Sequence, residues 1–280
     1  MGKRRSGQDS RAENEVGQFR EYLLDKELSE NTIKSYVASL KQYFSAHMAV
    51  TKKDGLDWKR ELQERGLSAK TVNVRLNAYN AFCDMQGCPD CKCKTMRVHQ
   101  ATAVSNVISK ADYERLLGCL KKDKNMRWYF GIKLLATTGA RVSEYVRLRK
   151  SDFDRGYAEL WTKGKIRRIY IPEHFREEAT EYYSDLDGTC FLIENRYGGQ
   201  ITTRGVSQSL LNFAERYGID KKVMHPHSFR HMFAVEFLKR NNNLSLLADV
   251  MGHSSMSTTA IYTRLTKEQQ ILAVNSAVTW

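Results

Sequence analysis

The amino-acid sequence predicts a mainly α-helical protein with one small antiparallel β-sheet. Most of the 280-residue chain carries apolar residues at the three- and four-residue spacing of amphipathic helices. Serine or threonine precedes several of these segments, as expected of helix N-caps. Strand-like alternation is confined to residues 157–171, and the helical pattern lapses between residues 87 and 106. The helices therefore form two groups.

The N-terminal group predicts a small four-helix domain made of two similar halves. Each half, residues 14–44 and residues 57–85, contains two amphipathic segments. The second helix of each half opens with the pattern L-S-x-x-T followed by an apolar residue, at residues 28–33 and 67–72. Serine is a preferred N-cap residue, and two helical hairpins of this length pack as a four-helix unit.

Changes in composition place the domain boundaries. The stretch from residue 87 to residue 106 is rich in Cys, Lys, Thr and Ala and interrupts the apolar periodicity. The expected division is a disordered basic lead-in (residues 1–13), a helical domain (14–90), a linker (91–108) and a second domain (109–280) that ends in an amphipathic tail helix (266–280).

The second domain begins with two helices and a β-hairpin. Ser109 caps the first helix, and residues 127–138 form a second, more continuously apolar one. Short strands are predicted at residues 157–161 and 167–171, on either side of the basic turn 162–165. The turn is therefore presented at the end of a short ribbon.

Four further helices follow the hairpin. Pro172 opens one of them, and the threonine pair 202–203 caps another. The next begins near His227 and carries phenylalanines at helical spacing. The fourth, residues 244–250, is ended by Gly252.

The charge of the chain favours a polyanionic partner. Lys and Arg number 45 against 32 acidic residues, which gives a net charge of +13 and a pI near 9.4. Nucleic acid is the commonest partner of such a surface, although a basic surface without a partner is the alternative. No apolar run reaches the length of a membrane span, and the N-terminus lacks the apolar region of a signal peptide. We expect a cytoplasmic protein.

Six cysteines raise the question of a metal site. Four of them, Cys83, Cys88, Cys91 and Cys93, are clustered before the second domain, and their spacing is compatible with zinc ligation. A single C-x-x-C pair with an adjacent thiol is only part of a usual four-ligand arrangement. Free thiols in a reducing compartment are therefore preferred, with structural zinc as the alternative.

The stretch from residue 225 to residue 262 contains most of the candidate catalytic side chains. His227 and Arg230 lie three residues apart on one helical face, His253 follows the next helix, and Tyr262 comes shortly afterwards. Arginine binds phosphate oxygens bidentately and never loses its proton. Tyrosine, with a pKa of about 10, needs neighbouring cations and a proton acceptor before it attacks. This set suits phosphodiester chemistry.

These motifs closely resemble the C-terminal signature of the tyrosine recombinase family, which includes phage-integrase and Xer-type enzymes. The family pattern H-x-L-R-H stands here at residues 227–231, with Phe229 in place of the usual leucine. L-G-H-S stands as M-G-H-S at residues 251–254, and Tyr262 follows His253 by nine residues. The resemblance covers nearly the whole chain. It implies the tyrosine recombinase fold, with an N-terminal SAM-like DNA-binding domain and an α-rich catalytic domain.

Two other segments extend the resemblance. Residues 138–144 match the pattern T-G-x-R-x-S-E, which implies that Arg141 is the first catalytic arginine, oriented by Glu144. An ordinary surface ion pair between these two residues is the alternative. Residues 162–164, T-K-G, are similar to the family's G-K-G and imply Lys163 as the general acid. Lys165 is its competitor, and a hairpin that merely touches phosphate is the other possibility.

The resemblance implies a site-specific recombinase that cleaves and rejoins DNA through a 3′-phosphotyrosyl intermediate, in integration, excision, inversion or resolution. The arginines would clamp the scissile phosphate, the histidines would donate hydrogen bonds, the lysine would protonate the leaving 5′ oxygen and the tyrosine would attack. No metal or other cofactor is expected. The implied catalytic set is Arg141, Lys163, His227, Arg230, His253 and Tyr262.

The expected partners are double-stranded DNA with an inverted-repeat site and further copies of the chain, as a tetramer on that DNA. The apolar tail helix would either pack on its own domain or, as in the resembling family, dock into a neighbouring protomer. Candidate DNA contacts are Lys92, Lys94 and Arg97 in the linker, Lys165 and Arg167 in the hairpin, and Arg204 and Gln208 on the helix after residue 202.

Two other functions are compatible with parts of this pattern. A type IB topoisomerase uses related chemistry, but the two-hairpin N-terminal domain and the tail argue against it. A non-cleaving DNA-binding protein would have no chemical reason to keep all six catalytic residues. His225 and His231, which lie outside that set, are expected to be structural.

Overall fold

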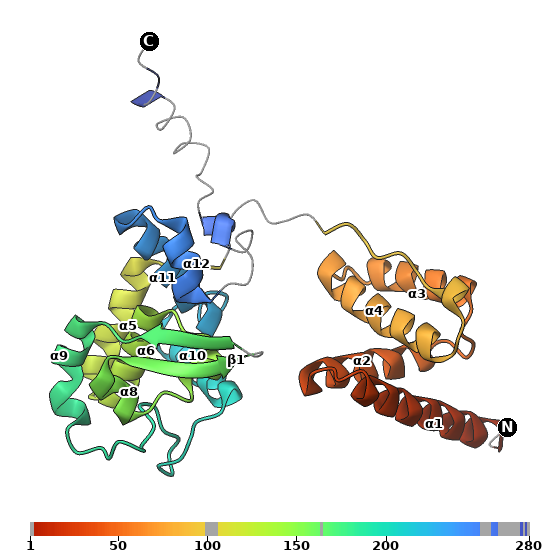
Figure 1. Cartoon of the computed structure of the whole chain (residues 1–280), viewed down its shortest axis with the longest axis horizontal. Helices are drawn as coiled ribbons and strands as arrows, with labels where there is room; N and C mark the ends of the chain where they lie inside the picture. Colours follow the sequence, from red (N-terminus) through yellow and green to blue (C-terminus); the bar gives the residue numbers. More distant parts are fainter. Residues whose placement is uncertain are drawn as a thin grey trace. The chain divides into compact units, whose positions relative to one another are not determined.

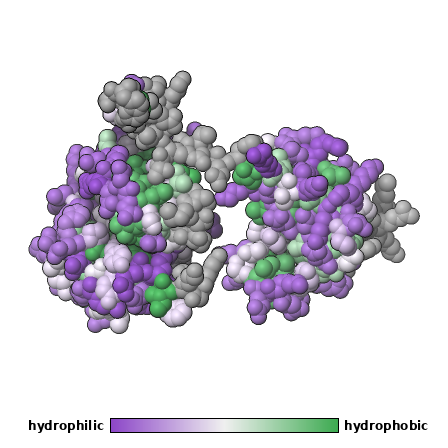
Figure 2. Space-filling model, turned by 45° about the horizontal axis from the view of Figure 1, so that its top comes forward, coloured by the Kyte–Doolittle hydropathy of each residue, from purple (hydrophilic) through white to green (hydrophobic). Residues whose placement is uncertain are grey.

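The computed structural model describes residues 3–98, 106–162, 165–252, 259–262, 275–276 and 278. The chain divides into two compact units, Met1–Gln100 and Ala101–Trp280 (Figure 1). Among the described residues, no helix is long and apolar enough to cross a membrane. In the view of Figure 2, hydrophilic residues cover most of the visible surface of each unit, and apolar residues gather in a few places.

The N-terminal unit is a bundle of four helices followed by a short 3-10 turn. Ser29 and Ser68 cap the second and fourth helices, and their hydroxyl groups accept the backbone N–H groups of Thr32 and Thr71 at 3.3 Å. The repeated L-S-x-x-T pattern is thus a repeated cap, as predicted. The elements are α1 (Lys3–Asp25), α2 (Glu30–Phe44), α3 (Lys52–Glu64), α4 (Ala69–Met85) and η1 (Pro89–Cys91).

Both ends of this unit differ from the expectation. Helix α1 begins at Lys3, where the sequence led us to expect a disordered lead-in through residue 13. The apolar second half of α1 is anchored in the core by Phe19 and Leu23, and a helix nucleated there extends at little further cost through polar residues. At the other end, residues 92–98 pack on α4 through hydrogen bonds from Asn80 to Cys93 and from Asn73 to Met96. The first half of the predicted linker is therefore part of the unit.

The C-terminal unit contains eight α-helices, one 3-10 turn and one hairpin among its described residues. Its two strands pair antiparallel from Tyr157 with Tyr170 to Thr162 with Lys165. The predicted mainly α fold with a small antiparallel sheet is confirmed. The elements are α5 (Lys110–Lys122), α6 (Met126–Thr138), α7 (Val142–Tyr145), α8 (Lys150–Arg155), β1 (Tyr157–Thr162), β2 (Lys165–Tyr170), α9 (Glu173–Tyr183), α10 (Thr203–Tyr217), α11 (Pro226–Arg240), α12 (Leu244–Met251) and η2 (Ala260–Tyr262).

Helix α11 organises the C-terminal unit. It contacts α6, α10, α12 and η2, while α12 also contacts strand β2. Phe229 of α11 is completely buried in the main core. His225 caps the helix by accepting the N–H of Ser228 on its Nδ1 atom, and Pro226 occupies the first turn, where a missing N–H costs nothing. The residues that follow this cap are thereby fixed relative to four neighbouring elements.

Candidate active site

Arg141 is held by a buried carboxylate. It is the N-cap of α7, and its backbone N–H donates to Glu144 Oε2 at 2.8 Å. Its Nη1 donates to Glu144 Oε1 at 2.9 Å, and its Nη2 donates to the carbonyl of Gly252 at 2.8 Å. The side chain of Glu144 is only 4% exposed, whereas that of Arg141 is 37% exposed. The pair is therefore not an ordinary surface ion pair: the carboxylate is fixed inside, and the guanidinium reaches the surface.

Arg167 belongs to the same cluster, which corrects its expected role as a DNA contact. Its Nε lies 3.2 Å from Glu144 Oε1, and its side chain is 7% exposed. Its Nη1 donates to the carbonyl of Met251 at the end of α12. Strand alternation explains the burial, because Arg167 shares the inner face of β2 with Ile169, while Ile166 and Arg168 face outward. Burial lowers its pKa.

Arg230 is the third arginine of the cluster. It is 3% exposed, and its Nη1 and Nη2 donate to the carbonyls of Gly139 at 2.5 Å and Met251 at 2.6 Å. Burial and the neighbouring charges of Arg141 and Arg167 lower its pKa to about 10, so it stays protonated at neutral pH. Three arginines around one glutamate leave a net charge of about +2 in a largely buried place, which is suited to an anion such as phosphate.

Two glycines shape the cluster. Gly139 ends α6 and Gly252 ends α12, both with positive φ angles, of 58° and 60°. A Cβ at Gly139 would meet the ring of Phe233, and one at Gly252 would collide with the guanidinium of Arg167. The carbonyls of both glycines accept the arginines, and a helix C-terminus carries partial negative charge that favours cations.

Tyr262 lies against α11. Its hydroxyl oxygen is 2.6 Å from His231 Nδ1, and the His231 ring lies near that of His227, with centroids 6.1 Å apart. Burial raises the pKa of Tyr262, and the charge of Arg230 acts in the opposite direction. His231, expected to be a core histidine, instead touches the predicted nucleophile. The spacing of four residues between His227 and His231 places the two histidines on one face of the helix, but it does not indicate the contact with Tyr262.

The remaining site residues divide into described and undescribed positions. Lys163 and His253 lie outside the described residues, as does most of the predicted tail helix 266–280. The choice between Lys163 and Lys165 stays a prediction. Lys94, Arg97 and Arg204 are exposed, Lys92 pairs with Asp84 at 2.5 Å, and Gln208 donates to Asn212 at 3.0 Å.

The cysteine cluster shows no metal site. All six thiols are free, and the residues described contain no group of three or more His, Cys, Asp or Glu side chains that could hold a metal ion. Cys83 and Cys93 are buried in the core of the N-terminal unit, and burial raises the pKa of both thiols. These two cysteines therefore act as small core residues.

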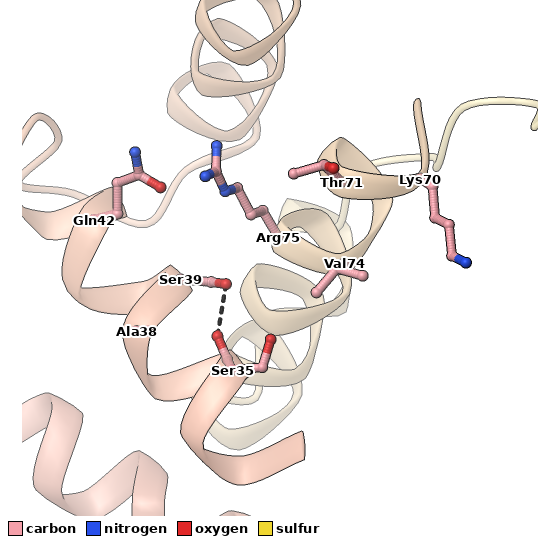
Figure 3. A pocket seen from close by; sticks show the side chains of 8 residues that line it. All are labelled: Ser35, Ala38, Ser39, Gln42, Lys70, Thr71, Val74 and Arg75. Carbon is pink, nitrogen blue, oxygen red and sulfur yellow. Dashed lines mark hydrogen bonds between the residues drawn. The ribbon is translucent and has the colours of Figure 1, made fainter. Parts of the chain in front are cut away.

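A second candidate surface, which sequence reasoning missed, is a hollow of about 440 Å³ between α2 and α4. Small and polar side chains line it, and Arg75 projects from α4 into it beside Gln42 and Thr71 (Figure 3). The Nη1 atom of Arg75 is buried and makes no hydrogen bond to any described residue. Burial and the charge of Arg65 lower its pKa. A guanidinium nitrogen without a hydrogen-bond partner, in a residue that lines an open hollow, suits an acceptor group on a bound molecule.

Replacing Glu144 by alanine is expected to destabilise the C-terminal unit by about 3–5 kcal/mol, because buried Arg167 would keep its charge without a counter-ion. Calorimetric unfolding of the full chain measures this effect. Glu114→Ala is the matched control, since Glu114 pairs with Lys110 at 3.8 Å and both side chains are exposed, so a change within about 0.5 kcal/mol is expected. Equal effects of the two substitutions would contradict the role given to Glu144.

Comparisons with known proteins agree with this geometry. The sequence profile described as "Phage integrase family" matches residues 106–269, more than half of the chain. The profile "Phage integrase, N-terminal SAM-like domain" matches residues 16–85. Tyrosine recombinase XerA of Pyrococcus furiosus is 28% identical over 268 residues, covering 93% of this chain and 92% of that protein. XerC of Oceanobacillus iheyensis is 30% identical over 284 residues, with 90% and 92% covered.

Solved structures share the fold. The Tn1549 transposon integrase in complex with circular intermediate DNA gives a TM-score of 0.73 at 19% identity, covering 94% of this chain and 99% of that one. A lambda integrase tetramer bound to a Holliday junction gives a TM-score of 0.72 at 14% identity, covering 89% and 76%. The motifs, the arginine cluster with Tyr262 and the matching profiles agree: the chain belongs to the phage integrase family and is a tyrosine-type site-specific DNA recombinase.

Proposed function

We propose that this recombinase cleaves DNA by forming a 3′-phosphotyrosyl bond through Tyr262 and rejoins strands by reversing that step. The observation that carries the proposal is the position of Tyr262 in η2, where its hydroxyl touches His231 of α11 and the charge of the neighbouring Arg230 opposes the rise in its pKa. A tyrosine beside a fixed cation is the arrangement that an attack on a phosphodiester requires.

The arginine cluster supplies the electrostatic part of the mechanism. Arg141 and Arg230 would hold the non-bridging oxygens of the scissile phosphate and neutralise the charge of its transition state. The contacts that fix them, to Glu144 and to the carbonyls of Gly139 and Met251, are already formed in the free protein. The site is therefore preorganised, so little energy is needed to arrange it when DNA binds. His227 and His253 would donate hydrogen bonds to the same phosphate.

The covalent step balances without an external reactant. The Tyr262 hydroxyl loses its proton as its oxygen forms a bond to phosphorus, and the bond from phosphorus to the 5′ oxygen breaks. Lys163 gives the 5′ oxygen a proton and is reprotonated from solvent, which takes up the proton of Tyr262, so one proton passes in net from the tyrosine to the 5′-hydroxyl. The phosphate ester conserves the energy of the broken bond. A 5′-hydroxyl of another strand then reverses the reaction. Integration, excision, inversion and resolution would all use this exchange.

Double-stranded DNA with an inverted-repeat site is the proposed substrate. The net charge of +13 supports a polyanionic partner, and the integrase of similar fold was solved with DNA. Exposed Lys94, Arg97 and Arg204 are proposed backbone contacts. The hollow around Arg75 is the proposed contact of the N-terminal unit, because Arg75 lines it and one guanidinium nitrogen of this residue has no hydrogen-bond partner among the described residues.

Arg75→Ala is expected to weaken DNA binding by about tenfold, since one phosphate or base contact is worth roughly 1–3 kcal/mol. The substitution removes an unpaired buried donor, so it should leave the thermal stability unchanged. Fluorescence anisotropy with a labelled duplex measures the affinity. Arg60→Ala is the control, because Arg60 is exposed on α3 and pairs with Asp57. Equal affinities of the two variants would remove Arg75 from the interface.

We also propose that copies of the chain assemble on DNA through the tail, residues 266–280. The tail carries five large apolar residues, and the C-terminal unit has an apolar groove of about 390 Å³ lined by Met232, Phe233 and Phe237. The lambda integrase of similar fold was solved as a tetramer. A groove of this kind suits the apolar face of a short helix.

Truncation after residue 265 tests this assembly. Mass photometry on a duplex that carries the recombination site is expected to find tetramers with the full chain and only monomers or dimers with the truncated one. Tetramers of the truncated chain would show that the tail packs on its own domain or elsewhere. DNA binding by a single protomer should be unchanged, which separates assembly from affinity.

The test of the proposed function is covalent capture of DNA from the protein's own genetic neighbourhood. Fragments are incubated with the protein and separated on a denaturing gel. We expect a protein–DNA band and a new DNA end that a kinase phosphorylates without prior phosphatase treatment, since it carries a free 5′-hydroxyl. Relaxation of supercoiled DNA without exchange of strands would favour the topoisomerase alternative. Binding of every fragment without any covalent band would favour a non-cleaving DNA-binding protein.

A further inference from the structure

His231 follows Arg230 in the sequence and makes a short contact with the hydroxyl of Tyr262. Its Nδ1 atom lies 2.6 Å from the tyrosine hydroxyl oxygen, with the two rings 5.5 Å apart at 53°. The contact joins α11 to η2, two elements that pack against each other. The proposed mechanism gives His231 no part.

The direction of this hydrogen bond follows from the protonation states of the His231 imidazole and the Tyr262 hydroxyl. Burial and the nearby His227, His225 and Arg230 lower the pKa of His231 to about 4, so its imidazole is neutral at pH 7. Burial raises the pKa of Tyr262, so its hydroxyl keeps its proton. The tyrosine therefore donates, Nδ1 accepts, and the imidazole proton is on Nε2.

We propose that His231 is the positioning residue that holds the hydroxyl of Tyr262 in the active site by accepting its hydrogen bond on Nδ1. This inference rests on the proposed role of Tyr262 as the nucleophile. The tyrosine is carried by a 3-10 turn of three residues, whereas His231 belongs to a helix of 15 residues that three other elements, α6, α10 and α12, also contact. The hydrogen bond to this packed helix therefore fixes the position of the Tyr262 hydroxyl.

A positioning role explains the data better than a role as general base. Burial lowers the pKa of His231 and raises that of Tyr262, so in the free protein the shared proton stays on the tyrosine and His231 is a poor acceptor of it. Placement, in contrast, has a large effect on rate, because an error of about 1 Å in a reacting atom costs on the order of 10²-fold.

Nuclear magnetic resonance of the full chain labelled with ¹⁵N-histidine tests the hydrogen bond without DNA. At pH 7 we expect the His231 ring to show an unprotonated Nδ1 and a protonated Nε2, and to titrate near pH 4. Tyr262→Phe, which lacks the hydroxyl, is expected to shift the Nδ1 resonance. A protonated Nδ1, or a resonance that Tyr262→Phe leaves unchanged, would overturn the proposal.

A second experiment compares three substitutions of His231 that differ in whether and where they carry a hydrogen-bond acceptor. Asparagine places its amide oxygen close to the position of Nδ1, glutamine places it near that of Nε2, and phenylalanine has no acceptor. The readout is the single-turnover rate of covalent complex formation on a DNA fragment that the wild-type protein cleaves. We expect His231→Asn to stay within about tenfold of wild type, and His231→Gln and His231→Phe to be slower by about 10²-fold.

The outcomes separate this inference from the proposed function. If the wild-type protein forms no covalent complex, the proposed function fails, while the resonance arm still decides whether the hydrogen bond exists. If His231→Phe reacts at the wild-type rate, or if His231→Asn is as slow as His231→Phe, positioning by Nδ1 is wrong. Equal DNA affinity and thermal stability of the three variants exclude a merely structural loss.

Discussion

Tyr262→Phe is expected to abolish covalent attachment to DNA while leaving DNA affinity unchanged. The substitution removes one oxygen atom, which is the proposed nucleophile, and keeps the aromatic ring that packs near α11. Loss of a catalytic nucleophile reduces the rate by at least about 10⁴-fold. The measurement is the amount of protein–DNA complex on a denaturing gel, with anisotropy to report affinity.

A matched control is available on the same protein. Tyr197 is an exposed tyrosine, 79% accessible and far along the chain from the site motifs, so Tyr197→Phe should cleave as the wild type does. Residual cleavage by Tyr262→Phe at more than about a hundredth of the wild-type rate would mean that another residue attacks the phosphate. The structure would then have placed the wrong side chain in the arginine cluster.

Arg230→Lys is expected to slow cleavage by about 10²–10³-fold although the positive charge is kept. Arg230 uses two terminal nitrogens to bind the carbonyls of Gly139 and Met251, and this fork fixes its plane. A lysine ammonium is a point charge on a flexible chain and cannot reproduce that geometry. Loss of one preorganised donor in an active site typically costs this much. Single-turnover cleavage measures the effect.

Arg115→Lys is the control for this substitution. Arg115 is an exposed arginine of α5 that pairs with Asp112, and its replacement should leave cleavage within about twofold. If Arg230→Lys cleaves as fast as Arg115→Lys, charge alone would be sufficient, and the fixed plane of the guanidinium would have no role in catalysis.

The sequence predicted the parts of the protein that local rules determine. Ser29, Ser68 and Ser109 act as the caps their positions indicated, and Gly252 ends α12 in the left-handed conformation. These features depend on a few neighbouring residues. The family motifs identified Arg141, Arg230 and Tyr262, and the structure brings the three residues into one cluster.

The features that sequence reasoning missed depend on contacts between distant segments. Arg167 is buried because β2 lies against the end of α12, which supplies carbonyls 83 and 84 residues further on. Glu144 provides the counter-charge from a third element. Strand alternation placed Arg167 on the inner face, but a basic residue in a basic hairpin indicates a surface contact when the partner carboxylate is unknown.

The contacts of His231 and Arg75 could not be predicted from the sequence for the same reason. Spacing along α11 put His231 near His227, yet only the position of η2 made it a neighbour of Tyr262. Arg75 is one of many arginines in a basic chain, and its unsatisfied donor becomes visible only when α2 and α4 are packed. Pairings of this kind are set by tertiary structure rather than by local pattern.

Mass spectrometry of the protein–DNA adduct tests the central claim most directly. The captured complex is digested with nuclease and protease, and the modified peptide is sequenced. We expect a nucleotide linked through its 3′-phosphate to the hydroxyl oxygen of Tyr262. A nucleotide on any other side chain, or a link through a 5′-phosphate, would contradict the proposed mechanism.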